Sequence, residues 1–183
     1  MSGINITRLL FDTILVKEKT MVKLIPMEQA DFSAYLERGI AEYAEDKVKS
    51  GNWTAEEALE RSRKEFEKYF PNGLQSKNQY VFSIVDGTSD QKLGMLWVEV
   101  KMDSPQHEAF IFDFRVKEEF RGKGYGKQAL VALDEKLISL NVDSVGLHVF
   151  GHNIVAQEVY KKSGYEITNI NMRKVFRKTG PAN

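Results

Sequence analysis

The chain has 183 residues, of which 42% are hydrophobic and 28% charged, and its formal net charge is zero. This length predicts one domain with one buried core, and the charge balance argues against general binding to nucleic acid or an anionic membrane. Cysteine is missing, which excludes disulfides, thiolate metal sites and a cysteine nucleophile. We expect neither a signal peptide nor a membrane span, because no cleavage site follows the first apolar run and no segment approaches about 18 apolar residues. A cytoplasmic location fits this pattern.

Residues 1–20 are expected to be an extension ahead of the fold, because the first strand pattern begins just after Met21. Pro26 limits the strand at 22–27 to an edge or ending position. A helix from residue 28 to about 49 is predicted by apolar side chains at three-to-four spacing, namely Phe32, Tyr35, Leu36, Ile40 and Tyr43. A capping box, Thr54 with Glu57, opens a second helix that runs to about residue 70. Its apolar positions are Ala58, Leu59, Phe66 and Phe70.

The pattern of the second half of the sequence predicts three strands, then a helix, and then a strand and a helix in alternation. Three strands that form an antiparallel meander are expected at 79–85, 93–100 and 109–116. The following elements are a helix over about 123–140, a strand at 144–149 in a parallel crossover, a helix at 154–163 closed by Gly164, and a last strand or hairpin at 165–170 and 172–176. Residues 177–183 are a polar tail. This order predicts an α+β fold with a mixed, mostly antiparallel sheet.

A basic, glycine-rich turn separates the third of these strands from the helix, and it contains Gly122, Gly124 and Gly126. Glycines allow positive φ and a close backbone approach, and the start of a helix directs N–H groups and a positive dipole at an anion. The interleaved cations are Arg121, Lys123 and Lys127. The spacing fits neither the dinucleotide fingerprint nor the P-loop. The turn therefore predicts a phosphate or pyrophosphate site of another kind, with a purely structural turn as the alternative.

Asn153 lies where the strand at 144–149 gives way to a helix, so its plain role is an N-cap. Tyr160 follows two helical turns later and shares a face with Asn153. A core tyrosine is the alternative interpretation of Tyr160.

Together the two segments resemble the GNAT superfamily of acetyl-coenzyme A-dependent N-acetyltransferases. The first, Arg121-x-x-Gly124-x-Gly126, is similar to its acetyl-coenzyme A signature, and Asn153…Ala156…Tyr160-Lys-Lys-x-Gly164-Tyr165 is similar to its downstream element. Val159 stands where leucine is usual. The resemblance covers residues 21–176 and implies a GNAT-like sheet whose parallel fourth and fifth strands splay apart.

The resemblance implies transfer of the acetyl group of acetyl-coenzyme A to a primary amine of a small molecule or peptide, by direct attack in a ternary complex. It also implies that a homodimer is possible. The implied contacts with the coenzyme come from the strand before the turn, from the turn itself and from the later helix: Phe114, Arg115, Val116, Arg121, Gly122, Lys123, Gly124, Tyr125, Gly126, Lys127, Asn153 and Tyr160.

The resemblance gives Tyr160 the role of the general acid that protonates the leaving thiolate. The family's usual glutamate base is replaced by Phe110, which leaves Glu99, Asp113, His107, Glu108 or a water relay as candidates. Strand alternation puts Phe110, Phe112 and Phe114 on one face and Asp113 on the other, unless a bulge intervenes. Glu99 is the base that we expect.

The acceptor pocket is expected between the first two helices and the strands. Its aromatic candidates are Tyr35, Tyr43, Trp53 and Trp97, and its acidic candidates are Glu42, Glu45 and Asp46. His148 and His152 lack a third partner, so we expect no metal. Two other functions stay open: a non-catalytic, regulatory acyl-coenzyme A-binding module of the same fold, and a protein that uses the turn to bind ATP.

Overall fold

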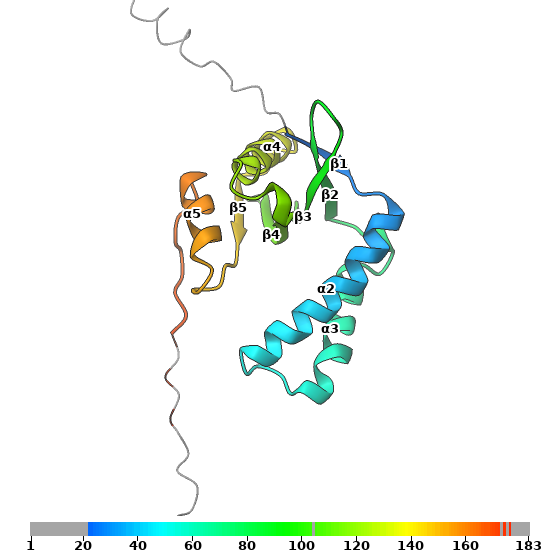
Figure 1. The fold of residues 1–183 in the computed structure, drawn as a ribbon, viewed down its shortest axis with the longest axis vertical. Helices are drawn as coiled ribbons and strands as arrows, with labels where there is room; N and C mark the ends of the chain where they lie inside the picture. Colours follow the sequence, from blue (N-terminus) through cyan, green and yellow to red (C-terminus); the bar gives the residue numbers. More distant parts are fainter. Residues whose placement is uncertain (1–21, 104, 173, 175, 177–183) are drawn as a thin grey trace, which may run out of the picture.

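The computed structural model describes residues 22–103, 105–172, 174 and 176 (Figure 1). The strands are β1 (Val22–Pro26), β2 (Gln79–Asp86), β3 (Lys92–Lys101), β4 (Glu108–Val116) and β5 (Ser144–Leu147). The α-helices are α2 (Gln29–Lys49), α3 (Ala55–Tyr69), α4 (Tyr125–Ser139) and α5 (Ile154–Lys162). Two short 3₁₀ turns are η1 (Gly73–Gln75) and η2 (Glu118–Phe120).

The strands form one sheet in the order β1-β2-β3-β4-β5. The first four strands pair antiparallel, and only β4 and β5 run parallel. The predicted α+β fold with a mixed, mostly antiparallel sheet is therefore confirmed. The helix α4 makes the crossover between the parallel strands, as expected.

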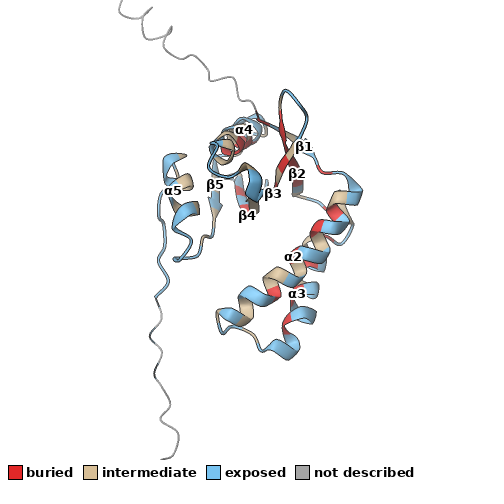
Figure 2. Cartoon of the chain, in the orientation of Figure 1, coloured by how far each residue is buried: buried red, intermediate tan, exposed pale blue. Residues whose placement is uncertain are grey.

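The two faces of the sheet are covered by different helices, and each face has its own core. The helix α4 buries Ala129, Leu130, Leu133 and Leu137 against one face. The helices α2 and α3 cover the other face with an aromatic core that includes Phe32, Tyr35, Phe66 and Phe70. In Figure 2 the buried positions gather in the strands and on one side of these helices, whereas α5 has none.

Several local predictions are confirmed, with adjusted boundaries. The capping box of α3 is present, with the Thr54 N–H donating to Glu57 Oε1 at 3.3 Å. Gly164 follows α5 with a φ of 88°, as a C′ glycine requires. The helix α4 begins at Tyr125 rather than at Lys123, because Gly124 has a left-handed φ of 81° that no α-helix contains. Leu59, predicted to be an apolar packing position, is half exposed instead.

The predicted last strand is wrong for the residues that can be assessed. Described residues in 165–176 belong to no strand, and positions 173 and 175 lie outside the described part. Beyond α5 the chain runs out from the body of the molecule (Figure 1). The segment contains β-branched and apolar residues, but a strand also needs a neighbouring strand to take its hydrogen bonds. In the described part of the chain, no helix has the length and apolar content to cross a membrane.

Candidate active site

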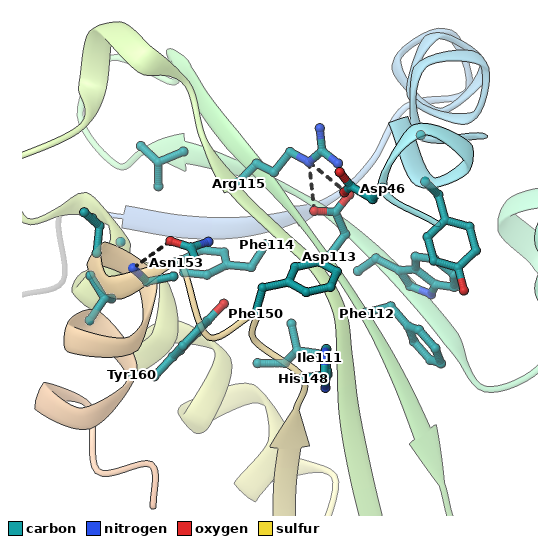
Figure 3. A pocket seen from close by; sticks show the side chains of 18 of the residues that line it. Asp46, Ile111, Phe112, Asp113, Phe114, Arg115, His148, Phe150, Asn153 and Tyr160 are labelled. Carbon is teal, nitrogen blue, oxygen red and sulfur yellow. Dashed lines mark hydrogen bonds and ion pairs between the residues drawn. The ribbon is translucent and has the colours of Figure 1, made fainter. Parts of the chain in front are cut away.

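A large cleft opens where β4 and β5 part. Their pairing ends at Ile111 with Leu147, whereas β4 continues to Val116. The β4 edge over 112–116 is therefore free of β5 and faces the cleft, whose other walls come from α2, α3, α5 and the glycine turn (Figure 3). The cleft has a volume of about 1390 Å³, whereas a single small ligand occupies a pocket of roughly 300–1,000 Å³. Two substrates can therefore occupy it together.

The glycine turn forms one end of this cleft. Gly122 and Gly124 have φ values of 73° and 81°, and Gly124 is the N-cap of α4. The first hydrogen bond of α4 is donated by the backbone N–H of Gln128 to the Gly124 carbonyl, at 3.2 Å. The N–H groups at the start of α4 consequently have no intrahelical acceptor, and the helix dipole adds positive potential there. This arrangement can bind a phosphate or pyrophosphate.

The three cations of the turn are not equivalent. Arg121 and Lys127 line the cleft. The Arg121 Nε donates to the Val116 carbonyl at 3.0 Å, which ties the turn to the end of β4. Lys123, in contrast, is not among the lining residues, because its Nζ donates to the Glu119 carbonyl at 2.9 Å. The side-chain charge at the cleft therefore comes from Arg121 and Lys127.

The helix α5 supplies the opposite wall. Asn153 caps it, with its Oδ1 accepting from the Ala156 N–H at 3.2 Å, which confirms the predicted N-cap. Tyr160 projects from the same helix toward the cleft (Figure 3), with its ring 6.3 Å from that of Phe114. Burial, and then the negative charge of Asp113, raise the pKa of Tyr160 to about 12. The phenol thus keeps its proton at neutral pH and can serve as an acid.

A β-bulge in β4 overturns the expected alternation of side chains. Trp97 pairs with Asp113 and Val98 pairs with Ile111, so Phe112 has no partner on β3. The extra residue puts Phe112 and Asp113 on the same face, which α2 and α3 cover, and Phe114 on the opposite face. The prediction that Asp113 faces away from Phe112 is therefore wrong, because it assumed an unbroken strand.

Asp113 belongs to an ion-pair network that links β4 to α2. Both of its carboxylate oxygens accept from the Arg115 Nε, at 2.9 and 3.1 Å, and Arg115 also pairs with Glu42 (Figure 3 shows the Asp113 pair). Tyr35 lines the cleft nearby, and its buried hydroxyl has no hydrogen-bond partner among the described residues. Burial, together with the Asp113 charge, raises the pKa of Tyr35.

Glu99, the base expected from the sequence, lies elsewhere. It pairs with Phe110 across β3 and β4, accepts from Gln79 Nε2 at 3.0 Å, and forms an ion pair with Lys101 at 3.2 Å. It lines a separate, smaller pocket. The structure thus does not bring Glu99 into the cleft with Tyr160.

The acceptor side contains some of the expected residues and several others. Tyr35, Tyr43, Trp97 and Asp46 line the cleft, whereas Trp53 lies outside the lining and packs on Tyr43 with a ring-centroid distance of 5.5 Å. The lining residues that sequence reasoning missed include Glu65, Tyr69, Phe112 and Phe150. Glu65 and Tyr69 are four residues apart on α3, so a helical-face argument at that end of α3 would have grouped them.

Comparison with known proteins identifies the class. The sequence model of the acetyltransferase (GNAT) family matches residues 41–165. The chain belongs to this family and is an acetyltransferase.

Two curated relatives are uncharacterized N-acetyltransferases of Bacillus subtilis (strain 168). YycN is 39% identical over 153 residues, which cover 84% of this chain and 97% of YycN. YdgE is 41% identical over 150 residues, which cover 81% and 94%. The crystal structure of YycN superposes with a TM-score of 0.79, covering 86% of this chain and 99% of YycN. An aminoglycoside acetyltransferase from an uncultured soil sample shares the fold alone, with 16% identity, a TM-score of 0.54, and coverage of 87% and 99%.

Proposed function

We propose that this acetyltransferase transfers the acetyl group of acetyl-coenzyme A to a primary amine of a small molecule or peptide, by direct attack while both substrates are bound. The observation that carries the proposal is the single cleft at the parting of β4 and β5, with an anion cradle at one end and Asp113 near Tyr160 toward the other. Acetyl-coenzyme A supplies an activated thioester; everything else is done by groups of this chain.

The residues of the cleft fit such a coenzyme. The N–H groups of 122–126, with Arg121 and Lys127, would hold its pyrophosphate. The free edge of β4 at 114–116 offers backbone groups to an extended, amide-containing arm, as an added strand would use them. Val155 is 79% exposed on the cleft side of α5, and an apolar or aromatic part of the coenzyme would cover it.

We assign the acid role to Tyr160 and the base role to Asp113. The Tyr160 phenol holds its proton until the thiolate leaves, and gives the proton to the sulfur. Asp113 takes a proton from the acceptor nitrogen as the new bond forms, when that nitrogen has become acidic. Glu99 was the base expected from the sequence, but its hydrogen bond with Gln79 and its separate pocket argue for Asp113 instead.

The proposal is tested by following thiol release from acetyl-coenzyme A in the presence of a panel of primary amines. We expect amine-dependent release, and stabilisation of the protein by coenzyme A that ATP does not compete away. Coenzyme binding without turnover of any amine would favour a regulatory acyl-coenzyme A-binding module. Stabilisation by ATP alone would contradict the assignment of the cradle.

We further propose that the functional unit is a homodimer. The strand β5 ends the sheet, and its outer edge pairs with no described strand. The segment beyond α5 carries exposed apolar residues, of which Ile170 is 74% and Met172 92% exposed. The outer edge of β5 in one copy could pair with the segment beyond α5 of a second copy. A two-fold axis would then give both copies the same backbone hydrogen bonds.

A further inference from the structure

The acceptor side of the cleft is walled by a continuous group of aromatic rings. We call this the aromatic row; its members, from α2, α3, β3 and β4, are Tyr43, Phe66, Tyr69, Trp97, Phe110 and Phe112. Phe112 lies at its centre, with ring centroids 4.5 Å from Trp97, 4.6 Å from Tyr69 and 5.0 Å from Phe110. Spacings of this size are those of directly packed rings.

The row has a buried back and an accessible front. Phe66 and Trp97 are buried and hold the others in place. Tyr69 and Phe112 are only half-buried, and Phe110 is exposed. All of these rings line the cleft. The front therefore offers a ligand an apolar surface that is already rigid, so that little ordering free energy is lost on binding.

The bulge in β4 sets the distance between this surface and the proposed base. Phe112 and Asp113 are consecutive and lie on one face of the sheet. Consecutive residues of a strand are separated by about 3.3 Å. An acceptor whose nitrogen lies at Asp113 can therefore place an aromatic ring on Phe112 only if a short link, on the order of two methylene groups, joins its nitrogen to its ring.

Three rings of the row carry a polar group, and two of these groups are already paired within the protein. The Tyr43 hydroxyl is already committed to Glu65, to which it donates at 2.9 Å, and the Trp97 indole N–H donates to Gln79 at 2.7 Å. An acceptor rich in hydroxyl groups would leave many of them desolvated and unpaired against the rings, which is unfavourable.

We propose that the acceptor is a primary amine joined by a short alkyl link to an aromatic or similarly flat apolar body, rather than a polyhydroxylated, multiply charged amine. The ring stacks on Phe112 and Tyr69 while the nitrogen lies at Asp113. This inference rests on the proposed acetyl transfer to an amine and specifies its acceptor.

Three acceptors separate the possibilities: 2-phenylethylamine, ethylamine and the aminoglycoside sisomicin, each with acetyl-coenzyme A and with thiol release as the measurement. We expect kcat/KM for 2-phenylethylamine to exceed that for ethylamine by at least about tenfold, the effect of burying a phenyl group. Equal or better use of ethylamine or sisomicin would overturn the inference and leave acetyl transfer intact. Turnover of none of the three, nor of any amine in the wider panel, would overturn both.

Substitution in the row tests the same point. Phe112→Leu should raise KM for 2-phenylethylamine by roughly three- to tenfold, the range for a lost ring contact, with kcat little changed. The loss should be smaller for ethylamine, so that the ratio of the two kcat/KM values falls. Tyr80→Leu is the matched control, because Tyr80 is an exposed aromatic residue of β2 outside the cleft lining. If Phe112→Leu does not fold, Tyr69→Leu replaces it, and an unchanged ratio of the two acceptors would contradict the inference.

Discussion

At the scale of single residues, the proposed chemistry depends on a carboxylate and a phenol that approach the cleft from opposite sides. Asp113 is oriented by Arg115, and Arg115 by Glu42, so that the carboxylate is held in place before any acceptor arrives. Tyr160 comes from α5 and keeps its proton because burial and Asp113 raise its pKa to about 12. The proposed roles as base and acid fit a carboxylate held by a guanidinium and a phenol that keeps its proton.

Replacing Asp113 by Asn should therefore lower kcat/KM by roughly 10²-fold, the lower range for loss of a general base. The Kd for acetyl-coenzyme A should change much less, because Asp113 is not part of the cradle at 121–127. Glu99→Gln is the control, since Glu99 lines a different pocket and glutamine keeps an acceptor for Gln79, and it should lower the rate much less than Asp113→Asn does. A larger loss in Glu99→Gln than in Asp113→Asn would reverse the assignment.

The local geometry of the glycine turn and of the cap at Asn153 could be predicted from the sequence, whereas the face on which Asp113 lies could not. The turn from Arg121 to Lys127 and the cap at Asn153 are set by neighbours in the chain, so spacing alone indicates their geometry. The face on which Asp113 lies depends on a bulge, and a bulge depends on the register between β3 and β4. The direction of the Lys123 side chain could not be predicted from the sequence either, because its ammonium group donates to the Glu119 carbonyl instead of facing the cleft.

At the scale of elements, the start of α4 is the part that we propose recognises the pyrophosphate. Its N-cap, Gly124, combines a left-handed φ with open space around the site of a Cβ atom. A side chain at this position would therefore extend into the region of the cradle without striking other groups.

Gly124→Asp and Gly124→Asn form a matched pair, because both side chains tolerate the left-handed region and have nearly the same size. We expect Gly124→Asp to bind acetyl-coenzyme A at least about tenfold more weakly than Gly124→Asn, since juxtaposed like charges cost 1.4 kcal/mol or more. Isothermal titration calorimetry provides both Kd values. Identical affinities would show that no anion lies near this position.

At the scale of the whole molecule, β5 is the last strand of the sheet among the described residues, while the chain continues into an exposed apolar segment. The strand predicted at 165–170 is chemically reasonable, because its residues favour strands. Among the described residues of a single copy, however, no neighbouring strand pairs with it. Pairing with a neighbour is a property of the assembly, which periodicity within one sequence does not reveal.

We expect size-exclusion chromatography with light scattering to give twice the mass of the chain. The double variant Ile167→Lys and Ile170→Lys should shift the equilibrium to the monomer, because it places charges on the proposed interface. Ile138→Lys is the control, since Ile138 is equally exposed but lies on α4. A monomeric wild type, or dissociation by Ile138→Lys alone, would contradict the proposed dimer.

The central claim is that the cleft both binds acetyl-coenzyme A and uses Tyr160 as the acid. It is tested most directly by measuring kcat and acetyl-coenzyme A affinity for the wild type and Tyr160→Phe, with an amine that the wild type acetylates. We expect the kcat of Tyr160→Phe to be lower by about 10²- to 10⁴-fold, the range for a lost general acid, with the Kd for acetyl-coenzyme A unchanged. Full activity in Tyr160→Phe would contradict it.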